Sequence, residues 1–249
     1  MLPLMRGSQR RETAQVSLDK LPPLPPPSQP TEEPCSKCGF PLWHRPCRNC
    51  LDLEDRRRAA QSRVVEALGG ERAFTEFTLA RFRVSPLTHA AYELAKRFDP
   101  TRDNMYLWSP SPGTGKTHLA VAAVRSLIEA GSVGCVLKPQ QVFGMMRATY
   151  EEGARGTDSE VLERLVRLPV LVLDDMGTAR DSDFSVQATF DLIDGRYMRR
   201  PTGLVMTSNI SPDGLALRWK DGRVASRISE LCRGRVFDFT GEPDHRRIG

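Results

Sequence analysis

A short apolar run followed by a glycine-rich loop and a helix constrains this chain more than any other feature. Met105-Tyr-Leu-Trp108 predicts a strand, Ser109-Pro-Ser-Pro-Gly-Thr-Gly-Lys-Thr-His118 follows it, and residues 116–130 have the pattern of a helix. Glycine lets such a loop turn its backbone N–H groups inward, and the helix N-terminus adds the positive end of its dipole. The arrangement therefore predicts a binding site for the phosphates of a nucleotide.

Two side chains of this loop carry the expected chemistry. Lys116 is expected to reach the β- and γ-phosphates, and the Thr117 hydroxyl is expected to bind Mg²⁺. Pro110 stands where the pattern G-x-x-x-x-G-K-[ST] has its first glycine, which restricts the entrance of the loop. The alternative is a glycine turn that binds nothing. The predicted nucleotide contacts in this segment are Pro112, Gly113, Thr114, Gly115, Lys116, Thr117 and His118.

From residue 103 onward, short apolar runs alternate with helical patterns. Short strands separated by helices favour an α/β fold with a mostly parallel five-stranded sheet that is covered on both faces. A further helical pattern precedes them at residues 87–97. Strands are expected at 105–109, 133–138, 169–174, 203–208 and 235–240, and helices at 116–130, 140–151, 158–167, 184–199, 213–219 and 222–232.

Polar residues follow two of these strands. Val170-Leu-Val-Leu-Asp-Asp175 ends in two carboxylates, and Gly203-Leu-Val-Met-Thr-Ser-Asn209 ends in an amide. At the carboxyl edge of a parallel sheet, Asp174 is expected to hold Mg²⁺ and Asp175 to orient or deprotonate an attacking water. Asn209 is expected to polarise that water or to bond the γ-phosphate, from a strand beside the other two. In isolation, such residues are also ordinary strand and turn endings.

Two arginines on one helical pattern form a further candidate site. Arg223 and Arg227 are spaced i, i+4 and therefore share a helix face. An arginine supplied to a neighbour's γ-phosphate neutralises charge in the transition state and contributes about 10³–10⁵ in rate. Without the preceding motifs, the same pair indicates only a solvated basic face.

The order of glycine loop, Asp-Asp, Thr-Ser-Asn and Arg-x-x-x-Arg resembles that of the AAA+ ATPases over about residues 70–249. Pro-Gly-Thr-Gly-Lys-Thr-His-Leu-Ala, Leu-Asp-Asp-Met-Gly and Thr-Ser-Asn-Ile-Ser-Pro are similar to segments of the DnaC/DnaI helicase loaders and the related IstB-type transposition helpers. The resemblance implies a P-loop three-layer sandwich that hydrolyses Mg·ATP between subunits, and hence self-association through the ATP site.

The same resemblance implies roles for residues outside the glycine loop. Asn209 matches the sensor-1 residue, and Arg227 matches the arginine finger that acts on the adjacent subunit's nucleotide, with Arg223 as a further nucleotide contact. Asp244-His-Arg246 resembles the closing Asp-x-x-Arg segment, whose arginine senses the nucleotide.

Four of the six cysteines form two C-x-x-C pairs, which predict a zinc site. Cys35 and Cys38 form one pair, and Cys47 and Cys50 form the other. In a chain without an export signal, clustered cysteines indicate metal ligands rather than disulfides, and four thiolates complete a tetrahedral Zn²⁺ shell. Free thiols or redox pairs are the alternatives. The remaining two, Cys135 and Cys232, lie in apolar segments and are expected to be small core residues.

The predicted zinc module mixes aromatic and basic residues, namely Phe40, Trp43, Arg45 and Arg48. Such residues can stack on single-stranded bases, and they can equally dock a partner protein. An N-terminal zinc module joined to a C-terminal ATPase resembles the layout of DnaI-type loaders, in which the module grips the helicase. We therefore favour helicase docking over DNA contact.

A segment after the second expected strand suggests contact with single-stranded DNA. Initiator-like AAA+ proteins carry an extra helical element at this point, and residues 139–151 resemble it. Lys138 and Arg147 are the candidate phosphate contacts. The alternative is a helix that faces the core through Val142, Phe143 and Met146.

The expected organisation is a disordered Pro-rich tail at 1–33, the zinc-binding module at 34–51, a helical linker and lead-in at 52–102, and the AAA+ domain at 103–249. No apolar run approaches the ~18 residues that span a membrane, and the N-terminus lacks a signal peptide's apolar core, so a cytoplasmic protein is expected. The formal net charge of +5 permits contact with nucleic acid.

These resemblances predict a helicase loader that positions a hexameric replicative helicase on single-stranded DNA. Its expected partners are that helicase, the DNA and further copies of this chain, and its expected cofactors are ATP, Mg²⁺ and Zn²⁺. Two alternatives remain open at this point. One is an IstB-type transposition helper, and the other is a zinc-containing adaptor that does not hydrolyse ATP.

Overall fold

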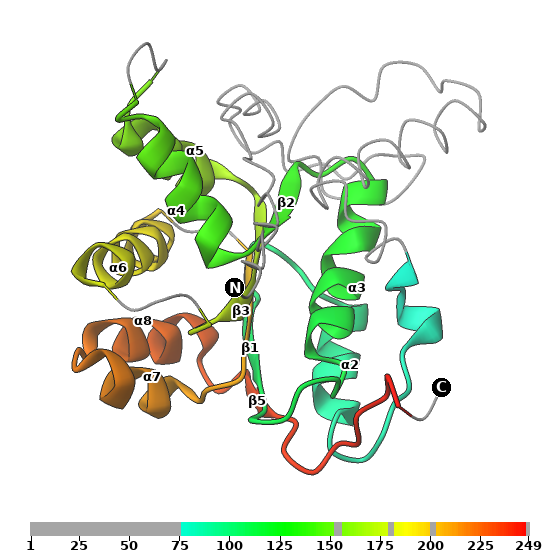
Figure 1. Ribbon diagram of the computed structural model, residues 1–249. Coiled ribbons are helices and arrows are strands. Elements are labelled where there is room, and N and C mark those ends of the chain that lie inside the picture. The colour runs from blue at the N-terminus through cyan, green and yellow to red at the C-terminus, as the bar shows by residue number, and fades with distance from the viewer. Residues whose placement is uncertain (1–75, 152–155, 179–181, 200–202, 248–249) are drawn as a thin grey trace, which may run out of the picture.

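The computed structural model of the 249-residue chain describes residues 76–151, 156–178, 182–199 and 203–247. Each strand and helix expected within these ranges is present, with its ends within three residues of the prediction. In chain order the elements are η3 (Leu79–Arg81), α2 (His89–Lys96), β1 (Asn104–Trp108), α3 (Lys116–Glu129), β2 (Gly134–Leu137), α4 (Pro139–Ala148), α5 (Asp158–Arg167), β3 (Val170–Met176), α6 (Asp183–Met198), β4 (Gly203–Ser208), α7 (Pro212–Trp219), α8 (Arg223–Cys232) and β5 (Val236–Asp238) (Figure 1).

The five strands form one sheet in the order β2-β3-β4-β1-β5, and every neighbouring pair is parallel. The expectation of a mostly parallel sheet is confirmed, because all five described strands run the same way. β4 lies between β1 and β3, as expected for the strand that leads to Asn209. The carboxyl ends of β1, β3 and β4 therefore meet at one edge, which brings the glycine loop, the two aspartates and Asn209 together.

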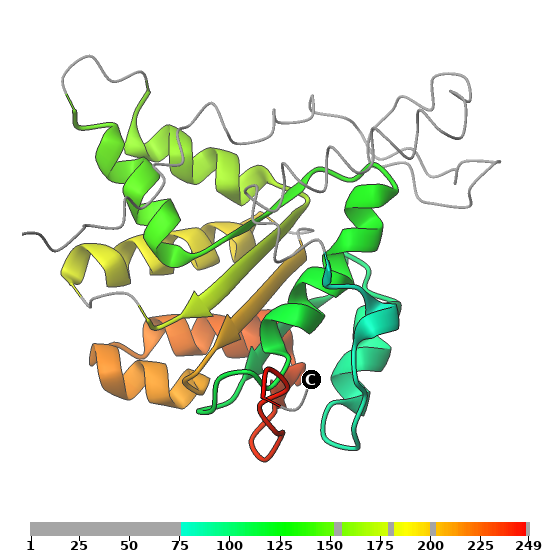
Figure 2. The same cartoon turned by 45° about the vertical axis from the view of Figure 1, so that its right-hand side comes forward.

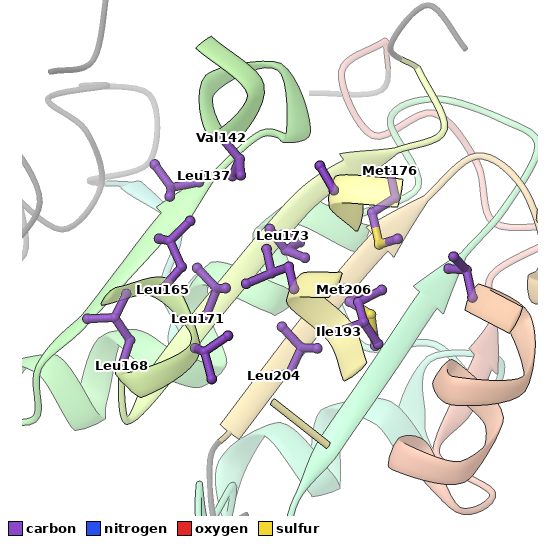
Figure 3. Packing of buried hydrophobic residues seen from close by; sticks show 14 of the residues in the cluster. Leu137, Val142, Leu165, Leu168, Leu171, Leu173, Met176, Ile193, Leu204 and Met206 are labelled. Atoms are coloured by element: carbon purple, nitrogen blue, oxygen red, sulfur yellow. The ribbon is translucent and has the colours of Figure 1, made fainter. Parts of the chain in front are cut away.

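Helices cover both faces of this sheet and complete a three-layer sandwich. Figures 1 and 2 show α2 and α3 on one face and α4 to α8 on the other. Alternate residues of each strand enter the two cores, because successive side chains in a strand point to opposite faces. Val170, Val172 and Val205 pack toward α3, whereas Leu171 and its neighbours in Figure 3 pack toward α4, α5 and α6.

The sheet face that carries Val170, Val172 and Val205 packs against α3, the helix that follows the glycine loop. Leu119 of α3 is fully buried there together with Val170 and Val205. Phe82 and Leu94, which precede β1, belong to the same cluster. Residues that the sequence analysis placed in a lead-in therefore form part of the core that supports α3.

On the other face, α5 begins at a capping signal in the sequence, and α4 turns its apolar residues to the core. The α5 helix begins after Thr157, whose hydroxyl accepts the Glu160 N–H while the Glu160 carboxylate accepts the Thr157 N–H. In α4, the three apolar residues expected to face the core are buried, which confirms that alternative for their side chains. Arg147 on the same helix is exposed and lies over the Phe184 ring, 5.4 Å from its centroid.

The two cysteines expected in the core are both buried free thiols, which confirms their structural role. Burial raises the pKa of Cys135 and of Cys232 to about 12, so both stay protonated. The four cysteines predicted to bind zinc, together with the Pro-rich tail, lie outside the described residues. Among the residues that the structure describes, no helix is long and apolar enough to cross a membrane.

Candidate nucleotide-binding site

The loop between β1 and α3 owes its shape to two glycines. Gly113 and Gly115 have φ of 74° and 91°, a region that residues with a Cβ rarely adopt. Gly115 is the N-cap of α3, so the loop runs directly into the helix N-terminus. Pro110 is not among the residues with positive φ. The loop therefore does not need glycine at the position where the sequence departs from the usual pattern.

Lys116 is the cation of this loop, and its side chain lies within it. Its Nζ donates to the Ser109 carbonyl at 3.3 Å, the Ser111 carbonyl at 2.8 Å and the Thr114 hydroxyl at 3.1 Å. Burial lowers the pKa of Lys116, and the Asp175 carboxylate opposes that shift. An ammonium group held among neutral oxygens in a partly dry loop is suited to an anionic ligand.

A carboxylate and two hydroxyl groups meet beside Lys116. Thr117 Oγ1 and Thr207 Oγ1 both donate to Asp174 Oδ1, each at 2.7 Å. Thr117 comes from α3, Thr207 from β4 and the buried Asp174 from β3, so the parallel sheet is what joins them. Hydroxyl and carboxylate oxygens are the ligands that Mg²⁺ prefers in proteins. This donor set fits the predicted metal.

Asp175 has an unusual backbone at the end of β3. Its φ is 65°, and the pairing between β3 and β4 shifts register there. The Asp175 N–H donates to Thr207 Oγ1 at 2.8 Å, and Asn209 Nδ2 lies 3.4 Å from Asp175 Oδ1. Burial raises the pKa of Asp175, and the adjacent Asp174 charge raises it further. A carboxylate with a raised pKa is better suited to accept a proton.

His118 follows the predicted metal ligand and faces an aromatic cluster. Its Nε2 lies 2.8 Å from the Thr78 carbonyl, which can only accept, so this nitrogen carries the proton. The ring stacks on Phe77 at 4.8 Å and meets Phe82 edge-on at 5.4 Å. Burial lowers the pKa of His118, which keeps the ring neutral near pH 7.

The C-terminal segment lies against the glycine loop from outside. The His245 N–H donates to the Gly113 carbonyl at 3.0 Å. The Asp244 carboxylate occupies the space that a Cβ at Gly113 would need. Arg246 follows, and its charge lowers the pKa of Lys116. The segment predicted to sense the nucleotide is thus placed at the loop.

Arg223 and Arg227 do not join this group of residues. Both lie on α8, on the face of the sheet opposite α3 (Figure 1). Arg227 pairs with Asp194 and Glu230, and Arg223 pairs with Asp221. Among the described residues, neither arginine contacts the glycine loop of its own chain.

The structure adds one site residue that sequence reasoning missed. Thr207 links Asp174 to the Asp175 backbone, yet only Asn209 was singled out from its strand. The available signal was a hydroxyl in an apolar strand, two residues before Asn209 and therefore on the same face. Phe82 also packs closely against Gly115, so that a Cβ added at Gly115 would lie 3.0 Å from the Phe82 ring. No local sequence pattern indicates this contact.

Comparison with known proteins shows similarity to DnaC. The chain is 27% identical to the replicative helicase loader DnaC of Escherichia coli (strain K12) over 106 residues, which cover 42% of this chain and 43% of that protein. The chain thus spans less than half the length of this relative. It is also 25% identical over 202 residues to the uncharacterized protein YqaM of Bacillus subtilis (strain 168), covering 75% of this chain and 62% of YqaM.

Solved structures share the fold. A crystal structure of the DnaC helicase loader matches 67% of this chain and 98% of its own, with a TM-score of 0.57 and 24% identity. AMPPCP-bound DnaA from Aquifex aeolicus matches 66% of this chain and 50% of its own, with a TM-score of 0.54 and 22% identity. These likenesses establish an AAA+-like α/β fold.

The strongest assignment comes from the family comparison, which covers most of the chain. The IstB-like ATP binding protein family matches residues 49–231, a range that includes the glycine loop, both aspartates, Asn209 and both arginines. The chain therefore belongs to the IstB-like ATP-binding protein family.

Proposed function

We propose that this protein is an AAA+ ATPase that binds and hydrolyses ATP between neighbouring copies of itself, and that loads a replicative helicase onto single-stranded DNA. The observation that carries the ATPase part is the meeting of Thr117 and Thr207 on Asp174 Oδ1, directly beside Lys116. Family membership supports ATP as the nucleotide.

The residues of one chain divide into three roles. Lys116 exchanges its bonds to loop oxygens for bonds to the β- and γ-phosphates, while Thr117 and Asp174 hold Mg²⁺. The metal, when bound, neutralises charge on the phosphate oxygens. Asp175 takes a proton from the attacking water, and Asn209, 3.4 Å from that carboxylate, orients it.

A second chain supplies a further positive charge that stabilises the γ-phosphate in the transition state. Arg227 lies on the opposite face of the sheet from α3, so it serves a neighbour's γ-phosphate rather than its own. Arg246, which acts on the pKa values of Lys116 and Asp175, responds to the nucleotide in the same chain. Hydrolysis then changes how neighbouring copies contact each other.

Similarity to DnaC supports the helicase as partner. The relatives that match over 106 residues are replicative helicase loaders, and residues 34–51 offer a candidate docking module. Lys138 and the exposed Arg147, next to and on α4, are the proposed contacts with DNA phosphates.

Loss of Lys116 tests the nucleotide site. We expect Lys116→Ala to weaken Mg·ATP binding about 10–100-fold, because a charge-assisted bond of about 1.5–3 kcal/mol is lost. Isothermal titration calorimetry measures this directly. The matched control is Lys96→Ala, which removes an exposed lysine of α2 that pairs with Glu93. Equal affinity in the wild type and Lys116→Ala would show that the nucleotide binds elsewhere.

The family match favours a second candidate function, that of an IstB-type transposition helper. Native mass spectrometry with Mg·ATP separates the two. A defined complex with the host's replicative helicase that is lost when residues 34–50 are deleted supports the loader. ATP-dependent filaments on duplex DNA, with no helicase complex, support the transposition helper. In both cases the chain hydrolyses ATP, whereas no turnover with either partner would refute the ATPase.

A further inference from the structure

The guanidinium of Arg227 is held by a residue of a different helix. Arg227 Nε donates to Asp194 Oδ1 of α6 at 2.5 Å, and Nη1 donates to Glu230 Oε2 at 2.6 Å. The guanidinium carbon also lies 4.4 Å from the centroid of the Tyr197 ring. The hydrogen bonds to Asp194 and Glu230 raise the pKa of Arg227, so the pairings favour its charged form. Three contacts thus restrain a side chain that is otherwise long and flexible.

These contacts leave one edge of the guanidinium available. A guanidinium has five N–H donors in a fixed planar fork. Two of its nitrogens are bonded to carboxylates, whereas Nη2 has no hydrogen-bond partner in the part of the chain that the structure describes. The side chain is still 29% exposed. Among the described residues, Nη2 therefore keeps donor capacity for an oxygen of another chain.

Asp194 and Glu230 restrain the Arg227 guanidinium in different ways, because they lie on different helices. Glu230 lies three residues after Arg227 on the same helix, so this pair would move together with α8. Asp194 and Tyr197 lie on α6, which packs along α8 in Figures 1 and 2. Only contacts from α6 can hold the guanidinium in a direction set by the rest of the domain.

The neighbouring arginine offers a comparison within the same helix pair. Phe190, Asp194 and Tyr197 recur at i, i+4 and i+7 and form one stripe along α6. Arg223 lies over Phe190, 4.5 Å from its centroid, and donates to the neutral amide oxygen of Gln187, also on α6, at 3.2 Å. Its carboxylate partner, however, is Asp221, two residues away. Its side chain is 53% exposed. Arg227 is the arginine whose charge partner comes from α6.

We propose that Asp194 is a positioning residue for the trans action of Arg227. It orients the guanidinium so that Nη2 points out of the α6–α8 surface, toward the γ-phosphate of a second copy of this chain. This inference rests on the proposed function, in which Arg227 serves a neighbour's nucleotide. Asp194 itself does not touch the phosphate.

A mixture of two variants isolates the effect. Lys116→Ala chains supply Arg227 but bind ATP about 10–100-fold more weakly, and Arg227→Ala chains bind ATP but lack the arginine. The ATP concentration is kept near the dissociation constant of the Arg227→Ala chains, so that the Lys116→Ala chains stay largely empty. Neither should turn over ATP alone, whereas their mixture forms working sites between unlike chains. Asp194→Ala is then added to one variant at a time, and steady-state phosphate release is measured with the ATP affinity.

We expect Asp194→Ala to lower turnover about 10–100-fold when it is in the Lys116→Ala chain, because misplaced catalytic groups lose about this much. In the Arg227→Ala chain it should change neither turnover nor ATP affinity. The matched control is Glu163→Ala in the Lys116→Ala chain, which removes the partner of Arg167 on the exposed face of α5 and should leave turnover unchanged.

The outcomes separate this inference from the proposed function. Equal loss in both chains, or no loss in either, would overturn the positioning role. A wild type that hydrolyses ATP together with an inactive mixture would overturn the trans role of Arg227, and the role of Asp194 with it. A wild type without turnover would refute the ATPase itself. Thermal melting of each variant checks that the domain remains folded.

Discussion

At Asp175 both the backbone and the charge are held in unfavourable states. A positive φ is rare for a residue with a side chain, and two others among the described residues, Lys220 and Arg233, adopt it as C-caps of helices. Asp175 adopts it inside a sheet, next to a second carboxylate. Such residues persist where surrounding contacts over-determine them, and they concentrate at functional sites.

The raised pKa of Asp175 predicts a pH-dependent cost in stability. Between the ordinary carboxyl pKa and the raised value, the folded chain binds more protons than the unfolded chain, so stability falls as pH rises through this window. We expect Asp175→Asn to raise Tm by about 2–4 °C at pH 7–8, the change that about 1 kcal/mol produces in a domain of this size. Asparagine also tolerates the left-handed backbone.

The gain in Tm should shrink as the pH falls toward the ordinary carboxyl pKa of 3.8, because below that value the Asp175 carboxyl is protonated in both states. At pH 7–8, Asp175→Asn should also lower hydrolysis about 10²–10⁴-fold, because the proton acceptor is lost. Calorimetry from pH 4 to pH 8 measures the first effect and phosphate release the second. Asp238→Asn, at the exposed end of β5, is the control of equal charge change. A Tm lowered equally at every pH would show that the aspartate charge is not what destabilises the fold.

Single residues of the site were predictable where their chemistry lies in consecutive positions. The loop from Gly113 to Thr117 was predicted from its glycine spacing, and the Asp174-Asp175 pair was predicted because it ends an apolar strand that follows this loop. Thr207 was not predicted, because its role exists only once β4 pairs with β3 and places its hydroxyl between Asp174 and the Asp175 backbone. A short segment of sequence does not show which strand will pair with it.

At the scale of elements, a buried arginine joins two helices to the sheet. Arg196 of α6 is fully buried and donates to the Leu165 and Val166 carbonyls at the end of α5 and to the Gly203 carbonyl at the start of β4. The last carbonyls of a helix lack partners within it. Arg196 supplies those partners and ties α5, α6 and β4 together.

We expect Arg196→Met to lower the free energy of unfolding by about 2–4 kcal/mol, because it leaves buried carbonyls without donors. Urea unfolding followed by circular dichroism gives this value. Arg199→Met is the control, because Arg199 is exposed three residues later, and it should change stability by less than about 0.5 kcal/mol. A similar value for both variants would mean that the bonds of Arg196 contribute little.

The elements themselves were largely predictable from the sequence. Each strand is a short apolar run, and α5 begins at the capping box formed by Thr157 and Glu160, whose residue types and spacing are typical of a helix start. The order of the strands follows from no single segment, since β1 pairs with β4 and β5, which are about a hundred or more residues later. The alternation of apolar runs and helical patterns predicted a sheet covered on both faces, and the resemblance to AAA+ proteins identified it as a P-loop three-layer sandwich.

At the scale of the whole molecule, the two ends of the described chain meet at the glycine loop. Ser85 donates to the Glu242 carboxylate, 157 residues away, and the His245 N–H donates to the Gly113 carbonyl. The Thr78 carbonyl accepts a hydrogen bond from the ring of His118, which directly follows the loop. Contacts between such distant segments depend on the completed fold, so local sequence patterns do not indicate them.

The module at residues 34–51 lies outside the described residues, so its zinc stays a prediction that metal removal tests. We expect one Zn²⁺ per chain by inductively coupled plasma mass spectrometry, and loss of this metal in Cys47→Ser, because four thiolates complete a tetrahedral shell. Cys135→Ala is the control, since this cysteine is buried in the sheet, and this variant should keep its zinc.

Removal of the zinc by chelation should leave Mg·ATP affinity within about twofold, because the described partners of Lys116 and Asp174 all lie beyond residue 108. A Cys47→Ser chain that keeps its full zinc content would contradict the four-cysteine site, and a parallel loss of ATP binding would show that the two parts of the chain depend on each other.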